Sequence, residues 1–412
     1  MPRPAGGAGV RGSPRGAGRR DAGRARAMSR GVGAAAESGA AERFLGVQIL
    51  RGLAAAMVVV FHLGRMAQLR AGADGAATLV GAAGVDLFFV ISGFIMAHTT
   101  RNGLAPGDFL RRRLARIFPL YALATALAFA LSFKTTAGGG GETLARLAAS
   151  LAFFPTFSPK GEIAPVFEPG WTLQYEAMFY AALALASALT PRNRLVLLAA
   201  MLLGAVGAGA LLSPRGAALA CWTSPLLLEF LAGCLIARLH DAGFAPPPRV
   251  AAAMIALGAG LLCAGAALAA GAQFTQHWRW LVWGAPAAVI VAGVVALERT
   301  GVFARFASFA RWGDRSYALY LTHPFVASLA GLALRDAHGA YAPPVALAAF
   351  ALSLAVAAVV HARIEQPLAR AFSPGAAARA VRVGPARAAD RVSVPDELGG
   401  QGTFSRLKSF RL

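Results

Sequence analysis

Charged residues are scarce in this sequence. Only 14% of its 412 residues are Asp, Glu, Lys or Arg, whereas 57% are hydrophobic and the mean hydropathy is +0.56. Soluble domains average about 25% charged residues, so this composition excludes an ordinary soluble protein. Apolar runs of about 20 residues, long enough to cross a ~30 Å hydrocarbon core, recur along the chain and indicate a polytopic membrane protein.

Cysteine is scarce as well. The three cysteines, Cys221, Cys234 and Cys263, lie in or beside apolar runs and have no C-x-x-C spacing. An odd count without that spacing argues against a disulfide framework. We therefore expect these side chains to pack as small hydrophobic groups, and we expect no metal site.

Acidic residues are few, so the formal charge of +21 invites a nucleic-acid-binding interpretation. However, eighteen of the 40 basic residues lie in residues 1–43 and 363–412, and most others lie in short loops between apolar runs. Such placement is typical of Lys and Arg that fix membrane topology and contact anionic lipid. The expected partner is therefore membrane lipid and not nucleic acid.

The hydrophobic pattern predicts an all-α fold, a polytopic bundle of about ten transmembrane helices. The predicted spans lie near 44–64, 79–99, 115–133, 171–189, 194–212, 220–239, 250–270, 279–297, 315–334 and 344–363. One alternating set of loops holds thirteen basic residues and the other holds eight, and both basic tails fall on the first side. The positive-inside rule then predicts that both termini are cytoplasmic.

We divide the chain into a transmembrane domain over 44–368 and two basic tails, 1–43 and 369–412, which we expect to be disordered. Met28 is an alternative start. The longest connection, roughly 134–170, is expected outside the membrane. Its apolar piece LARLAASLAFF is too short to span, and so predicts an interfacial or re-entrant helix.

Two ionisable residues, Arg51 and His62, interrupt the first apolar run. Such residues cost several kcal/mol inside a membrane and are candidate functional residues by default. Eleven positions at 100° each give about 1100°, roughly 20° past three full turns, so both side chains lie on nearly one helix face. At 1.5 Å per residue they stand roughly 16 Å apart along the axis.

Other spans carry further candidates. Asp86 lies in the second span, and Arg113 and Arg116 open the third span one turn apart, which suits phosphate binding. Glu176 is expected about two turns below the outer surface, at a depth similar to His62, where a carboxylate would orient an imidazole. The remaining polar candidates within the spans are Ser92, Tyr317, Tyr320, His323 and Glu365.

Taken in chain order, these motifs resemble the integral-membrane acyltransferase-3 family. They are Arg51 and His62 with ten residues between them, GVDLFFVISGF, the arginine pair followed by IFPLY, WTLQYEAMFY, LEFLAGC, SYALYLTH and IEQPL, spread over residues 48–368. PGWTLQYEAMFY and QILRGLAAAMVVVFH are most similar to the exopolysaccharide-production branch. That branch O-acetylates extracellular polysaccharide or its lipid-linked repeat unit.

The resemblance implies a ten-helix enzyme of the bacterial inner membrane with no bound cofactor. Its co-substrate would be cytoplasmic acyl-CoA, most simply acetyl-CoA. Its acceptor would be a carbohydrate on the outer side, an exopolysaccharide or a lipid-linked repeat unit, and other polysaccharide-assembly proteins are candidate partners. Some relatives carry a fused extracellular hydrolase-like domain, which we do not expect here, so transfer would be direct or through a separate protein.

The resemblance also assigns roles to residues. His62 matches the catalytic histidine, Arg51 its partner arginine, and Arg113 and Arg116 the pair linked to the donor. The positions expected to serve the acceptor site or the structure are Trp171, Tyr175, Tyr317 and His323.

The expected mechanism has His62 as general base, or as a covalent acyl carrier, with Glu176 or Asp86 orienting its ring. A rival interpretation is a transporter or flippase for lipid-linked sugars, whose intramembrane charges would line a substrate path. An acyltransferase for a peptide, antibiotic or lipid-anchored acceptor would share the same donor half. The acceptor, the acyl chain and the oligomeric state are not readable from the sequence.

Overall fold

The computed structural model describes residues 44–72, 75–103, 105–135, 143–271, 278–334 and 341–372. Within these ranges the chain is helical, apart from loops and one isolated antiparallel bridge between Phe157 and Ile163. The predicted all-α fold class is thereby confirmed. The predicted N-terminal tail and nearly all of the C-terminal tail lie outside the described residues.

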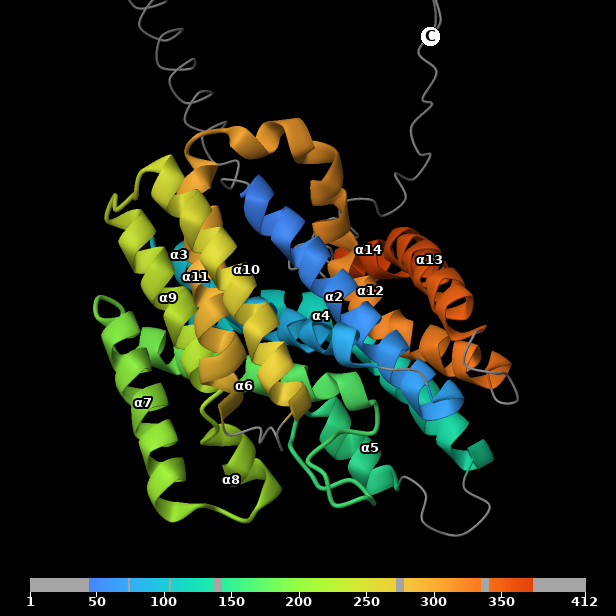
Figure 1. Ribbon diagram of the computed structural model, residues 1–412. Helices are drawn as coiled ribbons and strands as arrows, with labels where there is room; N and C mark the ends of the chain where they lie inside the picture. The colour runs from blue at the N-terminus through green and yellow to red at the C-terminus, as the bar shows by residue number, and fades with distance from the viewer. Residues whose placement is uncertain are drawn as a thin grey trace, which may run out of the picture.

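The helices follow one another along the chain with short connections (Figure 1). In order they are α2 (Leu45–Ala71), η1 (Ala76–Ala83), α3 (Gly84–Thr99), α4 (Pro106–Thr135), α5 (Leu144–Leu151), η2 (Glu168–Gly170), α6 (Trp171–Leu189), α7 (Arg194–Leu212), α8 (Ala217–Trp222), α9 (Leu227–Asp241), α10 (Pro248–Gly271), η4 (Trp280–Gly284), α11 (Ala285–Glu298), η5 (Val302–Phe306), α12 (Ala307–Ala333), α13 (Ala342–Val360), η7 (His361–Glu365) and α14 (Gln366–Phe372).

Eight helical segments of the described chain are long and apolar enough to cross a membrane. Each of the ten predicted spans coincides with a helix, but two of those helices, α6 and α12, do not reach that standard of length and hydropathy. Polar residues such as Gln174 and Glu176 in α6, and Arg311 and Arg315 in α12, lower their hydropathy. By composition, the chain is a multi-pass membrane protein.

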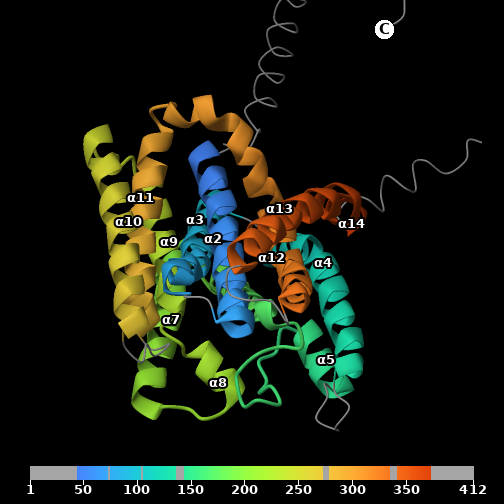
Figure 2. The ribbon, with the colours of Figure 1, turned by 45° about the vertical axis from the view of Figure 1, so that its right-hand side comes forward.

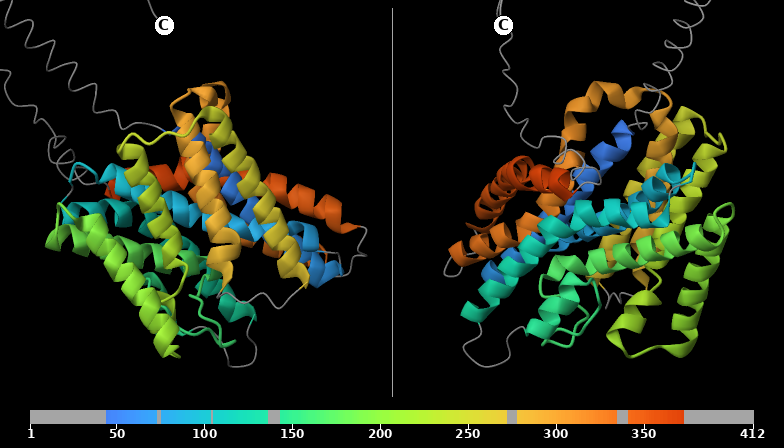
Figure 3. Two further views of the ribbon diagram at one scale, coloured as in Figure 1. Left: turned by 60° about the vertical axis from the view of Figure 1, so that its left-hand side comes forward. Right: turned by 180° about the vertical axis from the view of Figure 1, so that it is seen from behind.

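α2 lies near the centre of the bundle. It packs against α12 and α13 on one side and against α11 on the other, and α10 lies beyond α11 (Figure 2). α10 and α11 run side by side (Figure 3). Because α2 is surrounded in this way, ten of its residues are buried, with Val47, Ala54, Ala55 and Val59 fully so.

α2 and α12 run in the same direction and nearly touch. A Cβ atom at Gly313 would lie 2.1 Å from the carbonyl oxygen of Gln48, near the start of α2. Further along the pair His62 meets His323, and near its end Gly331 approaches Met66. Glycine at the first crossing therefore lets the two backbones approach closely, as small residues do in membrane helix packing.

The predicted short helix outside the spans is present as α5. Its N-cap is Thr143, whose side chain accepts a hydrogen bond from the Arg146 amide at 3.2 Å. Tyr121 of α4 donates its hydroxyl hydrogen to the carbonyl of Ser150 at 3.1 Å and so ties α5 to the bundle. α5, α8 and the connection into α6 gather at one end of the molecule (Figures 1 and 2), which we call the α5 end.

Because α2 and α12 pack closely at Gly313, alanine substitutions at two different glycines should have unequal effects on the stability of the protein. Gly313→Ala should lower the free energy of unfolding by about 1–3 kcal/mol, because the new methyl group overlaps the Gln48 carbonyl. Gly260→Ala in α10 is the matched control, since a Cβ there meets open space. The thermal midpoint of the detergent-solubilised protein measures both, and equal midpoints would contradict close packing at Gly313.

Candidate functional site

Arg51 and His62 lie on one continuous helix, as predicted. Both side chains face α12, because Arg51 interacts electrostatically with Asp314 and His62 contacts His323. The predicted common face is therefore confirmed. Both side chains are partly buried, and the helical rise separates them by roughly 16 Å.

His62 and His323 form a pair of imidazoles. Nδ1 of His62 lies 3.4 Å from Nε2 of His323, and the ring centroids are 4.9 Å apart at an interplanar angle of 54°. His323 is fully buried, and its Nδ1 lies 3.1 Å from the carbonyl oxygen of Leu319. Nδ1 of His62 also lies 3.3 Å from the carbonyl oxygen of Val58.

These contacts fix the tautomers of the pair when both rings are neutral. A carbonyl oxygen only accepts hydrogen bonds, so Nδ1 of His323 carries the hydrogen and its Nε2 has a lone pair. Nδ1 of His62 then faces two acceptors, Val58 O and His323 Nε2, and donates to them. The lone pair of His62 is consequently on Nε2, the nitrogen that has no hydrogen bond within the described chain.

A second group of polar side chains surrounds Arg51. Its Nη1 donates to Gln48 Oε1 at 3.2 Å, and its guanidinium interacts electrostatically with Arg116 and Glu176. Tyr317 lies in the same region, because its hydroxyl donates to the carbonyl of Ile117 at 2.6 Å. The structure thus brings together Arg51, Arg116, Glu176 and Tyr317, which lie on four different helices.

Arg113 and Arg116 lie on α4, one turn apart as predicted. Arg116 is exposed, whereas Arg113 is partly buried and lines a small cavity of about 60 Å³ together with Tyr180. Nε of Arg113 is buried and has no hydrogen-bond partner among the described residues. Phosphate binding by this pair stays a prediction.

Glu176 lies elsewhere than its predicted role requires. Its Oε1 accepts hydrogen bonds from Ser92 at 3.0 Å and from the hydroxyl of Tyr180. Its charge acts on Arg51 and Tyr317. Within the described chain, the hydrogen-bond partners of His62 are Val58 and His323, so His323 holds the ring that Glu176 or Asp86 was expected to orient.

Asp86 is engaged by Arg279. Nε and Nη2 of Arg279 donate to the two carboxylate oxygens of Asp86 at 3.0 and 2.7 Å, and Nη2 also donates to the carbonyl of Ala82 at 2.7 Å. Asp86 is fully buried and Arg279 is 7% exposed. The guanidinium also lies over the rings of Trp171 and Trp283, at 5.8 and 5.0 Å from their centroids.

Arg279 opens the predicted span 279–297, and the structure buries it in this ion pair. Glu229 joins the same group, since it is 2% exposed and interacts electrostatically with both Asp86 and Arg279. Sequence reasoning missed this role of Glu229. Its signal was present, because an acid inside the apolar run LEFLAGC is costly unless it has partners.

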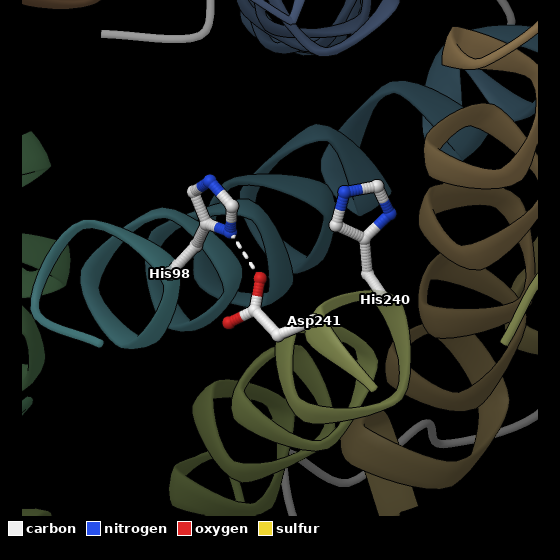
Figure 4. Close-up of side chains that lie close together, drawn as sticks. All are labelled: His98, His240 and Asp241. Atoms are coloured by element: carbon white, nitrogen blue, oxygen red, sulfur yellow. Dashed lines mark hydrogen bonds and ion pairs between the residues drawn. The ribbon is translucent and has the colours of Figure 1, made fainter. Parts of the chain in front are cut away.

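His98, His240 and Asp241 gather where the C-terminal ends of α3 and α9 meet (Figure 4), and their nitrogen and oxygen atoms lie within 4.8 Å of one another. Nδ1 of His98 donates to Asp241 Oδ1 at 2.7 Å, and Nε2 of His98 accepts from Arg101 at 2.6 Å. The guanidinium of Arg101 thus takes the side of His98 that a metal ion would need. We assign no metal to this group, which instead ties α3 to α9.

Comparison with known proteins decides the family. A profile of the acyltransferase domain family matches residues 44–362, which include all three groups around His62, Arg51 and Asp86. The chain belongs to the acyltransferase-3 family. This match extends over nearly the whole described part of the chain and confirms the resemblance inferred from the motifs.

Two relatives of this acyltransferase are similar over most of their length. The exopolysaccharide production protein ExoZ of Rhizobium meliloti (strain 1021) is 37% identical over 312 residues, which cover 73% of this chain and 95% of that protein. The acyltransferase MdmB of Streptomyces mycarofaciens is 29% identical over 327 residues, 71% of this chain and 82% of that protein. No solved structure matches the chain.

The Asp86–Arg279 pair predicts a large stability effect for this acyltransferase. Asp86→Ala should destabilise the fold by about 3–5 kcal/mol, because it leaves a buried guanidinium without its counter-ion. The double change Asp86→Leu and Arg279→Met removes both charges and should recover much of that loss.

The thermal midpoint of the purified protein measures these effects. Asp108→Ala is the control, because it breaks the exposed Asp108–Arg111 pair, whose side chains are 49% and 62% exposed, and should leave stability nearly unchanged. If Asp86→Ala and Asp108→Ala behave alike, the buried pair does not stabilise the bundle.

Proposed function

We propose that the protein is a membrane-embedded O-acetyltransferase that moves the acetyl group of cytoplasmic acetyl-CoA to a hydroxyl group of a carbohydrate on the opposite side of the membrane. The observation that carries this proposal is the placement of Arg51 and His62 on one face of α2, against one partner helix. Family membership supports acyl transfer. The similarity to a protein named for exopolysaccharide production supports a polysaccharide, or its lipid-linked repeat unit, as acceptor.

The donor binds at the arginine group. Arg113, Arg116 and Arg51 supply positive charge for the phosphates of CoA, and guanidinium groups bind phosphate through paired N–H donors. The buried, unpaired Nε of Arg113 is a donor that a phosphate oxygen would satisfy. Glu176 lies beside this group and keeps Arg51 in place electrostatically.

The reactive end of the donor lies near His62. The roughly 16 Å between Arg51 and His62 is of the order of the reach of an extended pantetheine arm, so a donor held at Arg51 delivers its thioester toward the imidazole. The acetyl group would thus cross about half of the ~30 Å hydrocarbon core while CoA stays on its own side.

His62 acts as general base through Nε2. It removes the proton from the acceptor hydroxyl, the hydroxyl oxygen attacks the thioester carbonyl, and the carbon–sulfur bond breaks. The proton on His62 then passes to the departing thiolate, so the products are an O-acetyl ester and free CoA. His323 is a positioning residue, because its Nε2 accepts from His62 Nδ1 and holds the reactive lone pair on the other nitrogen.

The proposed setting is the bacterial inner membrane. We place both termini in the cytoplasm. We count α6 and α12 as membrane spans in addition to the eight, which gives ten, since both belong to the bundle although polar residues lower their hydropathy. The α5 end then faces away from the cytoplasm, toward the acceptor. Other polysaccharide-assembly proteins are the expected partners, and no bound cofactor is required.

The central test uses the purified protein in liposomes with labelled acetyl-CoA and a lipid-linked oligosaccharide. The unaltered protein should give O-acetylated sugar and free CoA, and His62→Ala should lose transfer by at least about 100-fold because the base is missing. The control is Leu69→Ala, about two turns further along α2 and 70% exposed. A protein that moves the lipid across the membrane and leaves the thioester intact would instead be a flippase.

The positioning role of His323 is tested by comparing the effects of substitutions on kcat and on the KM for acetyl-CoA. His323→Ala should lower kcat about 10- to 100-fold with little change in the KM for acetyl-CoA, because the arginine group is untouched. His323→Gln restores an acceptor for the His62 Nδ1–H and should recover part of kcat. Equal loss in both variants would assign His323 a packing role only.

A further inference from the structure

A cavity of about 1000 Å³ lies at the α5 end of the molecule. Its walls come from the connection between α5 and α6, the first turns of α6, the last turn of α7, the α8–α9 segment and η4. The side chains that matter here are Glu162, Glu168, Trp171, Gln174, Tyr175 and Trp280. Trp171 and Tyr175 are two of the positions that the family resemblance leaves open between the acceptor site and the structure.

The side-chain oxygen of Gln174, in this wall, has no hydrogen-bond partner among the described residues. Its side chain is 1% exposed, and Nε2 donates to the carbonyl of Phe154 at 3.2 Å. Its Oε1 is buried and has no hydrogen-bond partner in the described part of the chain. A buried acceptor without a donor costs about 1–3 kcal/mol, so the oxygen favours a ligand that brings a hydroxyl or amide hydrogen.

The aromatic side chains of the wall suit a flat ring. The rings of Trp171 and Tyr175 lie 5.9 Å apart and nearly perpendicular, at 89°, and Trp280 completes the set. The guanidinium carbon of Arg279 lies 5.8 Å from the centroid of the Trp171 ring. Asp86 holds Arg279 by an ion pair, so the indole packs against a fixed group. Aromatic faces of this kind pack against the C–H faces of sugar rings.

The polar groups of the wall are mainly acceptors. Glu162 and Glu168 contribute exposed carboxylates, and Gln174 contributes a carbonyl oxygen. Of the described residues that line the cavity, none is Lys or Arg. Acceptors of this kind match the hydroxyl donors of a sugar, whereas the two carboxylates disfavour a ligand that carries its own negative charge.

A short series of side-chain contacts links the Trp171 part of the cavity wall to the histidine pair. The hydroxyl of Tyr320 lies 3.0 Å from Thr172 Oγ1 and donates to the carbonyl of Pro169 at 3.0 Å, both next to Trp171. The Tyr320 ring lies 6.0 Å from the ring of His323, which contacts His62. Tyr320 therefore lies between the first turn of α6, which contributes Trp171 to the cavity wall, and His323, which contacts the proposed base.

We propose that this cavity is the acceptor site and that it selects an uncharged sugar ring over an acidic one such as a uronic acid. The inference rests on the proposed function for the identity of the reaction. It adds the place where the acceptor binds, the residues that hold it and the charge that it carries. Gln174 accepts from a hydroxyl group, Trp171 and Trp280 bracket the ring, and Glu162 and Glu168 exclude anions.

Binding is tested without acetyl-CoA, so the result does not depend on catalysis. The full-length protein in detergent is titrated calorimetrically with a neutral tetrasaccharide of β-linked glucose and with a tetrasaccharide of glucuronic acid. Trp280→Ala and Gln174→Leu should each weaken binding of the neutral probe about tenfold or more, which corresponds to the loss of one good contact. Trp278→Ala is the matched control, because Trp278 is 57% exposed and is not part of the cavity wall.

A double variant tests whether the two carboxylates make the site prefer an uncharged sugar. Replacing Glu162 and Glu168 together by Gln should raise the affinity for the acidic tetrasaccharide and bring it closer to that for the neutral one. Thermal midpoints of all variants, measured in parallel, separate loss of binding from loss of fold.

The proposal is overturned if the unaltered protein does not bind the neutral probe, or if all variants bind it equally. Equal binding of the two probes by the unaltered protein would overturn the selectivity. If sugar binding follows the expected pattern but no acetyl transfer occurs in liposomes, the acceptor site stands and the proposed reaction fails. Transfer without any effect of Trp280→Ala or Gln174→Leu would place the acceptor elsewhere.

Discussion

Two helices that run in the same direction, α2 and α12, meet backbone to backbone where Gly313 faces the carbonyl of Gln48. From this crossing the remaining partners follow by helical rise. Asp314, the next residue of α12, comes opposite Arg51, and His323 comes opposite His62. A side chain at position 313 would push the helices apart and separate both pairs together, so one small residue sets the spacing of the arginine group and of the imidazole pair.

The bundle also shows how charges are kept inside a largely apolar molecule. The ionisable side chains of the spans are gathered in separate groups, and in each group hydrogen bonds or opposite charges offset the cost of burial. Asp86 and Arg279 bond through two parallel contacts, and Arg101 and Asp241 bond to the two nitrogens of His98. Arg51 is less completely satisfied by protein, which is what a site that receives an external anion requires.

Much of this arrangement could be predicted from the sequence because it is local. The helices, the short α5 and the common face of Arg51 and His62 follow from hydrophobic periodicity and from the regular geometry of one helix. The two helices that fell below the hydropathy standard, α6 and α12, illustrate the limit of composition, because polar residues such as Glu176 and His323 have protein partners within the bundle. For Glu176, that partner is Tyr180 together with Ser92.

The partners themselves could not be predicted in this way. Asp86 and Arg279 are 193 positions apart, and His62 and His323 are 261 positions apart. The local sequence pattern around each residue therefore does not identify its partner. Depth along a span also misplaced Glu176, because depth does not say which neighbouring helix a side chain meets. Only the packing of α6 against its neighbours shows that this carboxylate acts on Arg51.

The hydrogen bonds of the two imidazoles end at backbone carbonyls, because His62 donates toward Val58 and His323, and His323 donates to Leu319. A carbonyl oxygen does not take up and pass on a proton under these conditions, so the chain of donors stops there. A proton that reaches His62 on Nε2 has to leave by the same side of the ring. The pair is therefore a dead end for proton transfer, so it gives protons no path across the bundle.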